Sequence, residues 1–234
     1  MIEEVEVTIL NEKQKQNLRV TKSNSLVNAH YDLNVTEMRI LRFCISKIDS
    51  RQKTAPSKIK LYAKEYSEMF NCVNPYQDLK EATDKLFESE ITYFDSERDK
   101  YYRTRWVQTA LYEKNEGSVT LEFSTVVKKQ LNDLTKNFTS YQIKHLGSLS
   151  SKYSIRLYEL LYQYHGIGAR EIEVKELREM FQLQEKYPLF SDFRKFVITK
   201  SIEEINNKTD LEIKVYTIKK GRSVTHIKFT IKRK

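Results

Sequence analysis

Apolar residues in this chain follow helical and strand spacings that recur in a fixed order. The first half predicts a helix over 36–48, a strand over 58–62, helices over 63–71 and 75–90, and three strands over 91–124. The second half predicts a helix over 152–165, a strand over 170–174, helices over 175–182 and 191–206, and two strands over 211–232. Because the order repeats, we expect two similar modules in tandem.

The order of elements in each half is that of a winged helix, a helix-turn-helix followed by a β-hairpin. The sequence therefore predicts an α+β protein made of two tandem winged-helix domains with a pseudo-twofold internal repeat. A short sequence match, EYSEMF in the first half and ELREMF in the second, falls at the same place in the order. We expect a lead-in over 1–20, partly disordered and with an edge strand at Val5–Leu10, and domains over 21–146 and 147–234, joined near LGSLSS.

Several residues mark where elements begin. Asn34 and Glu37 have the spacing of a capping box, and Asn74 before Pro75 predicts a capped helix start. The helix over 75–90 has one apolar face, formed by Leu79, Ala82, Leu86 and Phe87. Trp106 is expected in the core.

Charge narrows the choice of partners. The 234 residues carry 41 Lys and Arg against 32 Asp and Glu, a net charge of +9 that suits a polyanion such as DNA. Cys44 falls in an apolar helical run and predicts a core thiol, and two cysteines suit a reducing compartment. There is no apolar run that could span a bilayer and no signal-peptide pattern at the N-terminus, so we expect a cytoplasmic protein with no membrane partner.

The sequence gives no support for catalysis. A nicking enzyme would need a pair of histidines at metal-ligand spacing, but His30, His145, His165 and His226 are scattered. GIGARE over 166–171 lacks the ending of a phosphate loop and is interpreted as a helix C-cap and turn. We expect no enzymatic activity, no metal and no cofactor.

The helix over 191–206 is the strongest candidate for base recognition. Ser191 is expected to cap it, and its apolar side would be formed by Phe193, Val197, Ile198, Ile202 and Ile205. Early residues of a recognition helix meet base edges, so we expect base contacts from Arg194, Lys195 and Thr199, although 100° spacing places Arg194 over the apolar side. Phosphate contacts are expected from Ser191, Lys200, Lys186 and Tyr187. The same pattern is typical of an ordinary surface helix with a solvated charged face, and Asp192 and Glu203 on that face would repel phosphate.

Basic residues also gather at a predicted hairpin tip. Lys219, Lys220 and Arg222 surround Gly221, as suits close approach to a sugar-phosphate backbone. The corresponding DNA-contact candidates of the first domain are Asn74, Tyr76, Gln77, Lys80, Lys85, Arg103 and Arg105.

The second half also resembles a known family. SKYSIRLYELL, the ELREMF helix and SDFRKFVITKSIEEINNKTDL followed by IKKGR are similar to the C-terminal domain of Rep_3-type plasmid replication initiators, and the resemblance covers roughly Val20–Lys234. It implies that Lys152, Tyr153 and Arg156 lie against the DNA backbone, and that the wing contacts it as well. Tyr153 is equally compatible with a position in the core. For the first domain it implies supporting DNA contacts and the dimer interface.

The resemblance implies binding to repeated sites, or iterons, at a plasmid origin. Bound monomers would open AT-rich DNA and recruit the host replication initiator and helicase, and dimers would repress the chain's own gene. Two alternatives stay open: a tandem winged-helix transcription regulator without a replication role, and a protein-interaction module that binds no DNA.

Overall fold

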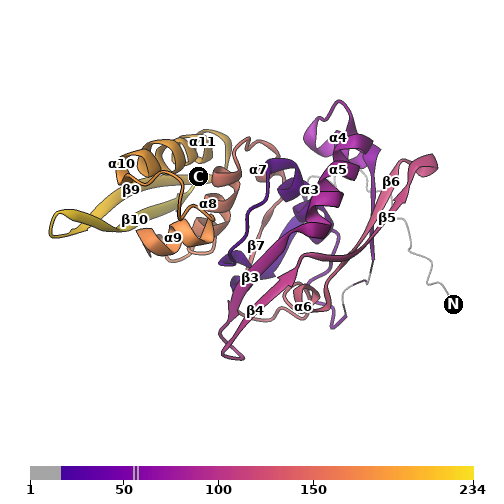
Figure 1. The fold of residues 1–234 in the computed structure, drawn as a ribbon, viewed down its shortest axis with the longest axis horizontal. Helices are drawn as coiled ribbons and strands as arrows, with labels where there is room; N and C mark the ends of the chain where they lie inside the picture. Colours follow the sequence, from indigo (N-terminus) through magenta and orange to yellow (C-terminus); the bar gives the residue numbers. More distant parts are fainter. Residues whose placement is uncertain (1–16, 55, 57) are drawn as a thin grey trace.

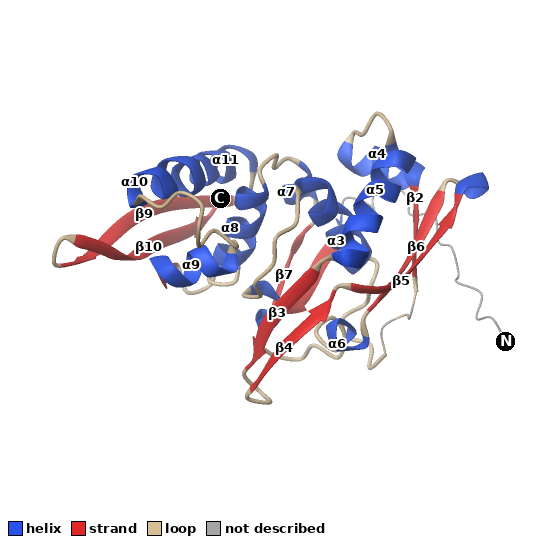
Figure 2. Cartoon of the chain, in the orientation of Figure 1, coloured by secondary structure: helices blue, strands red, loops and turns tan. Residues whose placement is uncertain are grey.

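The computed structural model describes residues 17–54, 56 and 58–234, and it contains two winged helices in tandem (Figures 1 and 2). The first consists of α3 (Val35–Ser46), β2 (Ile59–Tyr62), α4 (Ala63–Phe70), α5 (Pro75–Glu88), β5 (Val107–Glu113) and β6 (Ser118–Phe123). The second consists of α8 (Lys152–Tyr162), β8 (Ala169–Glu173), α9 (Val174–Met180), α10 (Phe190–Phe193), η2 (Arg194–Thr199), α11 (Lys200–Lys208), β9 (Leu211–Lys220) and β10 (Ser223–Arg233). The predicted α+β class is confirmed.

The internal repeat is visible in the sheets. The three strands of the first winged helix are ordered β2-β6-β5, and those of the second β8-β10-β9. In both sheets the short strand pairs antiparallel with the last strand of the wing, as Ile59 with Leu121 and Ile172 with Ile227. These residues are buried, so each sheet presents one apolar face to its own helices.

The first domain carries additional elements. β1 (Arg19–Ser23) pairs with β7 (Phe138–Gln142), and β3 (Glu90–Asp95) pairs with β4 (Lys100–Arg105). The shorter pieces are α2 (Asn24–Val27), η1 (Lys114–Glu116), α6 (Thr125–Lys128) and α7 (Lys144–Gly147). β1 includes the end of the predicted lead-in, whereas the edge strand expected at Val5–Leu10 lies outside the described residues.

The prediction of three strands over 91–124 was wrong, because the structure has four. The break falls at Trp106, which is fully buried against Tyr31 with the two ring planes at 88°. The Trp106 carbonyl accepts a hydrogen bond from the backbone N–H of Ser124. The buried ring ends β4 and starts β5 in a different sheet, so Tyr101 and Thr109 do not lie on one strand face.

The predictions of where helices begin agree better with the structure than the strand count does. The Asn34 side chain accepts from the Glu37 N–H and the Glu37 carboxylate accepts from the Asn34 N–H, so the capping box is confirmed. Asn74 occupies the N-cap position of α5, but its side chain makes no capping hydrogen bond. Cys44 is fully buried, as expected. Phe87 was misplaced on the buried face of α5, since its ring is exposed beneath the Arg105 guanidinium.

The long helix of the second domain runs without interruption from α10 through η2 to α11. Ser191 does not cap it: the helix begins at Phe190, Leu189 is the N-cap, and Ser191 is the second helical residue. The segment Arg194–Thr199 has π-helical hydrogen bonding, which widens the turn. Arg194 is consequently exposed, in contrast to the position over the apolar side that ideal α-helical spacing predicted.

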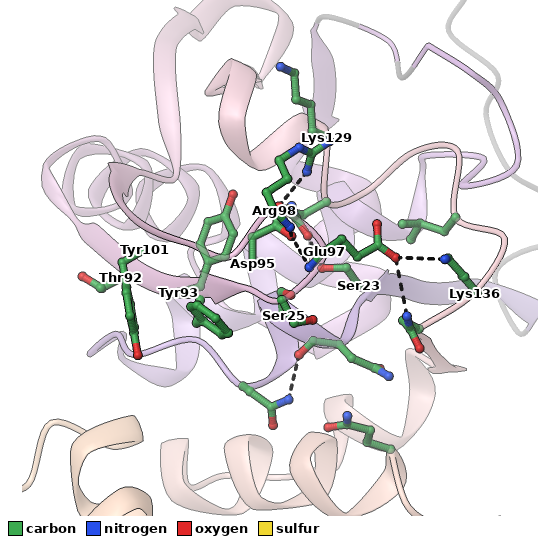
Figure 3. A pocket seen from close by; sticks show the side chains of 18 of the residues that line it. Ser23, Ser25, Thr92, Tyr93, Asp95, Glu97, Arg98, Tyr101, Lys129 and Lys136 are labelled. Carbon is green, nitrogen blue, oxygen red and sulfur yellow. Dashed lines mark hydrogen bonds and ion pairs between the residues drawn. The ribbon is translucent and has the colours of Figure 1, made fainter.

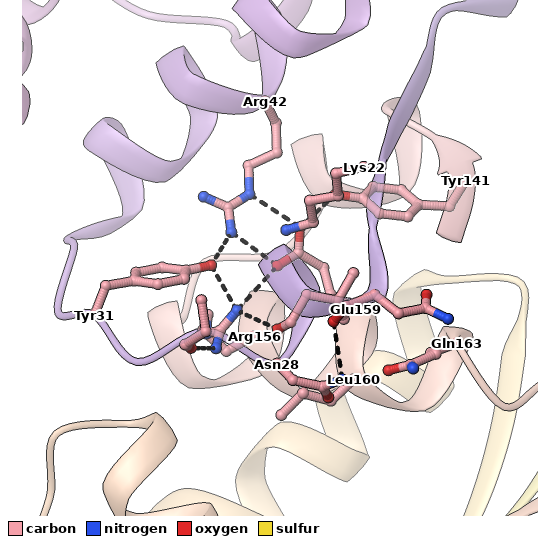
Figure 4. Close-up of polar contacts among 12 residues, drawn as sticks. Lys22, Asn28, Tyr31, Arg42, Tyr141, Arg156, Glu159, Leu160 and Gln163 are labelled. Carbon is pink, nitrogen blue, oxygen red and sulfur yellow. Dashed lines mark hydrogen bonds and ion pairs between the residues drawn. The ribbon is translucent and has the colours of Figure 1, made fainter. Parts of the chain in front are cut away.

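A buried ionic cluster joins α8 to β1, α3 and β7 (Figure 4). The Glu159 carboxylate is fully buried and lies 2.8 Å from both the Lys22 ammonium and the Arg42 guanidinium, and 3.6 Å from Arg156. The Tyr141 hydroxyl also donates to Glu159. Each cation needs this carboxylate, because an unpaired buried charge is strongly destabilising.

The contacts in this cluster shift the pKa values of Glu159 and Lys22. Burial alone would raise the pKa of Glu159, but the Arg42, Lys22 and Arg156 charges outweigh burial and lower its pKa below the usual value. Burial lowers the pKa of Lys22 to about 7, against the opposing attraction of Glu159. The cluster thus depends on an ionised Glu159.

Candidate nucleic-acid interface

The long helix of the second domain divides into a buried and an exposed side. The predicted apolar side is confirmed, because the five residues expected there are all buried: Phe193, Val197, Ile198, Ile202 and Ile205. The exposed side carries Ser191, Arg194, Lys195 and Lys200, with Thr199 half-buried among them. Packing therefore fixes the helix and leaves its basic side free for a partner.

The loop before this helix is held by a residue that the sequence did not single out. The Arg178 guanidinium, from α9, donates to the carbonyl oxygens of Lys186 (3.0 Å) and Tyr187 (2.7 Å). It also lies 4.4 Å from the centre of the Phe193 ring. Tyr187 has a φ of +55°, a strained conformation that these contacts support. Arg178 thus fixes where Lys186 and Tyr187 sit, although sequence spacing gave no signal for it.

The wing of the second domain ends in a basic turn. Gly221 and Arg222 form the two-residue tip between β9 and β10, and Gly221 has a φ of +63° that favours glycine. Lys219, Lys220 and Arg222 are all exposed. The tip and the N-terminal part of the long helix both lie toward the end of the second domain that is farther from the first domain (Figure 1).

The basic side chains of the two domains differ in whether they form ion pairs. Within the part of the chain that the structure describes, no carboxylate pairs with Arg194, Lys195, Lys200, Lys219, Lys220 or Arg222. These six positive charges are therefore available to an external anion. Their spacing along one helix and one hairpin is typical of a surface that contacts phosphates.

Three of the seven first-domain candidates already pair with carboxylates of the chain. The side chains of Asn74, Gln77, Lys80, Lys85, Arg103 and Arg105 are exposed and that of Tyr76 is half-buried. Lys80 pairs with Asp84 at 3.0 Å and Arg103 with Glu90 at 2.6 Å, while Gln77 donates to Glu81. Exposed pairs of this kind contribute little stability, so an anion can compete for them.

The first-domain wing is not the cationic tip that an exact repeat would imply. Its turn holds Glu113 and Glu116, and the Lys60 ammonium lies 3.0 Å and 2.6 Å from their carboxylates. Basic residues of this domain instead lie on the separate β3–β4 hairpin. The two domains thus share a topology and differ in surface charge.

The prediction that Arg156, near the start of α8, contacts the DNA backbone was wrong. Arg156 is only 2% exposed, and its guanidinium donates to the carbonyl oxygens of Val27 and Ala29 and to the Tyr31 hydroxyl. It faces the first domain, because these acceptors and Glu159 surround it, and it is therefore not placed to contact DNA. Lys152 stays at the surface, paired with Asp32 at 2.5 Å.

Tyr153 is half-buried, with its ring stacked on Phe181 at 6.0 Å between centroids. Burial raises the pKa of its hydroxyl to about 12, so the group remains a neutral hydrogen-bond donor. The ring is positioned by packing, and half-burial leaves part of the side chain open to a ligand.

A polar cleft of about 1070 Å³ lies where the turn between β3 and β4 approaches α2 and α9 (Figure 3). Its lining mixes Asp95, Glu97 and Glu179 with Arg98 and Arg170. Asp95 is buried and accepts from Arg98 at 2.6 Å. Opposite charges here compensate one another, so the cleft lacks the net positive charge of the helix and wing.

Two classes of site are absent from the described residues. Over residues 17–54, 56 and 58–234 there is no cluster of three His, Cys, Asp or Glu side chains arranged to hold a metal ion. None of the helices in this part of the chain combines the length and apolarity that a bilayer crossing requires.

Comparison with known proteins places this geometry in a family. The model of the first winged-helix domain of initiator replication proteins matches residues 19–162, and the model of the second matches residues 173–231. Two relatives from Escherichia coli are the PI protein, 29% identical over 53% of this chain and 46% of its own, and a replication initiation protein, 24% identical over 92% of this chain and 69% of its own.

A solved structure has the same fold. The crystal structure of the Pi initiator protein in complex with iteron DNA is 22% identical, covers 92% of this chain and 97% of its own, and superimposes with a TM-score of 0.79. The two family models together match most of the chain and confirm the resemblance seen in the sequence. The chain belongs to the Rep3-type plasmid replication initiators.

Proposed function

We propose that this chain binds double-stranded DNA at the iterons of a plasmid origin and initiates replication there. The observation that carries the proposal is the set of six unpaired basic side chains on the long helix and the wing tip of the second domain. Such a surface attracts a polyanion and places a rigid helix where a major groove can receive it. Family membership and a fold neighbour crystallised with iteron DNA support the same partner.

Within this surface we assign different tasks to different residues. Arg194 and Lys195 read base edges, since Arg and Lys form bidentate contacts with guanine, and Thr199 contributes an adaptable hydroxyl. Contacts to phosphate are assigned to Ser191, Lys200, Lys186, Tyr187, Lys219, Lys220, Arg222 and Lys152. Tyr153 adds a hydroxyl edge to these backbone contacts.

The first domain has a supporting role in the proposal. It contributes α5, with Asn74, Tyr76, Gln77, Lys80 and Lys85, as a second helix toward the DNA, and Arg103 and Arg105 from its extra hairpin. The domain boundary near residue 146 and a dimer interface in the first domain belong to the same proposal. One chain then reaches successive major-groove faces without a second subunit.

The biological consequences are proposed from the family. Bound monomers open neighbouring AT-rich DNA and recruit the host replication initiator and helicase in the cytoplasm, and dimers repress the chain's own gene. The chain acts through binding and not through catalysis.

Replacing Lys220 with alanine is expected to weaken binding evenly across DNA sequences. A wing-tip ammonium contacts phosphate, so its loss lowers affinity without changing preference, and the slope of log affinity against log salt concentration falls by about 0.9. Fluorescence anisotropy on a preferred and a scrambled duplex at several salt concentrations measures both quantities.

Arg51→Ala serves as the matched control, because Arg51 is also exposed but is paired with Asp49 on a first-domain loop. Its affinity and salt slope should equal those of the wild type. An unchanged salt slope in Lys220→Ala would remove the wing tip from the interface.

A further inference from the structure

An aromatic ring lies exposed in the middle of the basic helix side. Phe196, in the π-helical segment η2, is 39% exposed, whereas its neighbours Val197 and Ile198 are fully buried. The apolar side of the helix is complete without it. A phenylalanine that keeps this much surface in water gains little from folding, so the ring remains available to a partner.

The surroundings of the ring indicate which partner. The Lys195 ammonium lies 5.1 Å from its centre and the Lys200 ammonium 5.3 Å, and neither is paired with a carboxylate of the described residues. Arg194 is exposed on the same segment. An apolar protein partner would have to desolvate these charges, whereas DNA neutralises them with phosphates and base-edge acceptors.

The ring is also held in place. Tyr187 stacks on Phe196 at 5.9 Å between centroids, with the planes 26° apart, and Tyr187 itself is fixed through its carbonyl by Arg178. One face of Phe196 is therefore covered and cannot slide between two bases as an intercalating wedge. What remains open suits contact with a small apolar group on a groove wall.

Only one apolar group projects into the major groove of unmodified DNA, the 5-methyl group of thymine. We propose that Phe196 is a specificity-determining residue that contacts a thymine methyl group, next to the base read by Lys195. This inference deepens the proposed function and rests on it.

The test removes the methyl group from the DNA and the ring from the protein. A preferred site is first selected from random duplexes with the full-length wild-type chain. Each thymine of that site is then replaced in turn by deoxyuridine, which lacks only the methyl group, and affinities are measured for the wild type, Phe196→Ala and Phe196→Leu.

For the wild type, replacing one thymine, or either of two adjacent thymines, should lower the affinity for the duplex about fourfold. This is the effect of one buried methyl group. Phe196→Ala should bind the thymine and deoxyuridine forms of that site equally, and Phe196→Leu should retain part of the difference. Phe138→Ala is the matched control: Phe138 is 42% exposed but lies on β7 of the first domain, so the variant should behave as the wild type.

The outcomes separate the inference from the proposed function. If a site is selected but wild type and Phe196→Ala respond alike to every replacement, Phe196 reads no thymine and the inference fails alone. If no sequence is enriched, sequence-specific binding fails and the inference fails with it.

Discussion

Replacing Glu159 with glutamine is expected to lower the free energy of unfolding by about 3–5 kcal/mol, the cost of removing one partner from a buried charge pair. The carboxylate is fully buried and is shared by Lys22, Arg42 and Arg156. Glutamine keeps the shape but removes the charge, so the buried Arg42 and Arg156 guanidinium groups, and the Lys22 ammonium whenever it is protonated, lose the carboxylate that compensates them. Urea denaturation followed by circular dichroism measures the change.

Acid should reproduce part of this effect in the wild type. The pKa of Glu159 is lower in the folded chain than its ordinary value, so the folded state favours the ionised form. Its stabilisation is present above the unfolded pKa of about 4.5 and is lost as the pH falls through the folded value. The glutamine variant should lack this part of the acid dependence.

Glu203→Gln is the control, since it makes the same substitution at an exposed position of α11. We expect a change within about 0.5 kcal/mol there. A loss below about 1 kcal/mol in Glu159→Gln would contradict the view that this carboxylate holds α8 against the first domain.

A large loss of DNA affinity is expected from substitutions in the second-domain helix. Replacing Arg194 or Lys195 with alanine is expected to cost about 1–3 kcal/mol in affinity for the preferred site and to relax sequence preference, because each removes a base-edge contact. Affinity for a scrambled duplex should fall much less. Anisotropy titrations of both duplexes give the ratio that measures specificity.

Lys208→Ala tests whether loss of any helix charge would do the same. Lys208 lies at the far end of α11 and pairs with Glu204 at 2.9 Å, so its removal should leave the ratio unchanged. Finding the wild-type ratio in both Arg194→Ala and Lys195→Ala would exclude them from base recognition.

Structural features that depend on residues close in the sequence could be predicted. The Asn34–Glu37 capping box needs only adjacent backbone, and the buried side of the long helix follows from its own spacing. The order of elements, and with it the tandem winged helix, follows from many such local signals together.

Long-range packing could not be predicted in the same way. The family resemblance assigned Arg156 to the DNA backbone. Its actual partners Val27 and Ala29 lie more than 120 positions away in the sequence, so no spacing rule could indicate that it is buried. Trp106 divides two strands whose alternation continues across it without a turn signal.

Phe196 was not predicted as a contact, although α-helical spacing already places it on the polar side of the helix with Lys195 and Thr199, because DNA contacts were assigned to basic and hydroxyl-bearing side chains. The position of Arg194 was mispredicted for a different reason. Ideal α-helical spacing does not anticipate a π-helical segment, so the helix faces near Arg194 shift. Functional surfaces are where such departures from regular geometry are expected.

We propose that one chain reads DNA with two unlike helices. α5 presents Gln77 and Lys80, whereas the second-domain helix presents Arg194 and Lys195, so the two halves of a monomer's site must differ in sequence. Selection of random duplexes by the full-length chain, followed by the stoichiometry of the selected site, tests this most directly. We expect an asymmetric site that binds one chain. A palindromic site occupied only by two chains, or no enriched sequence, would contradict DNA recognition by two unlike helices of one chain.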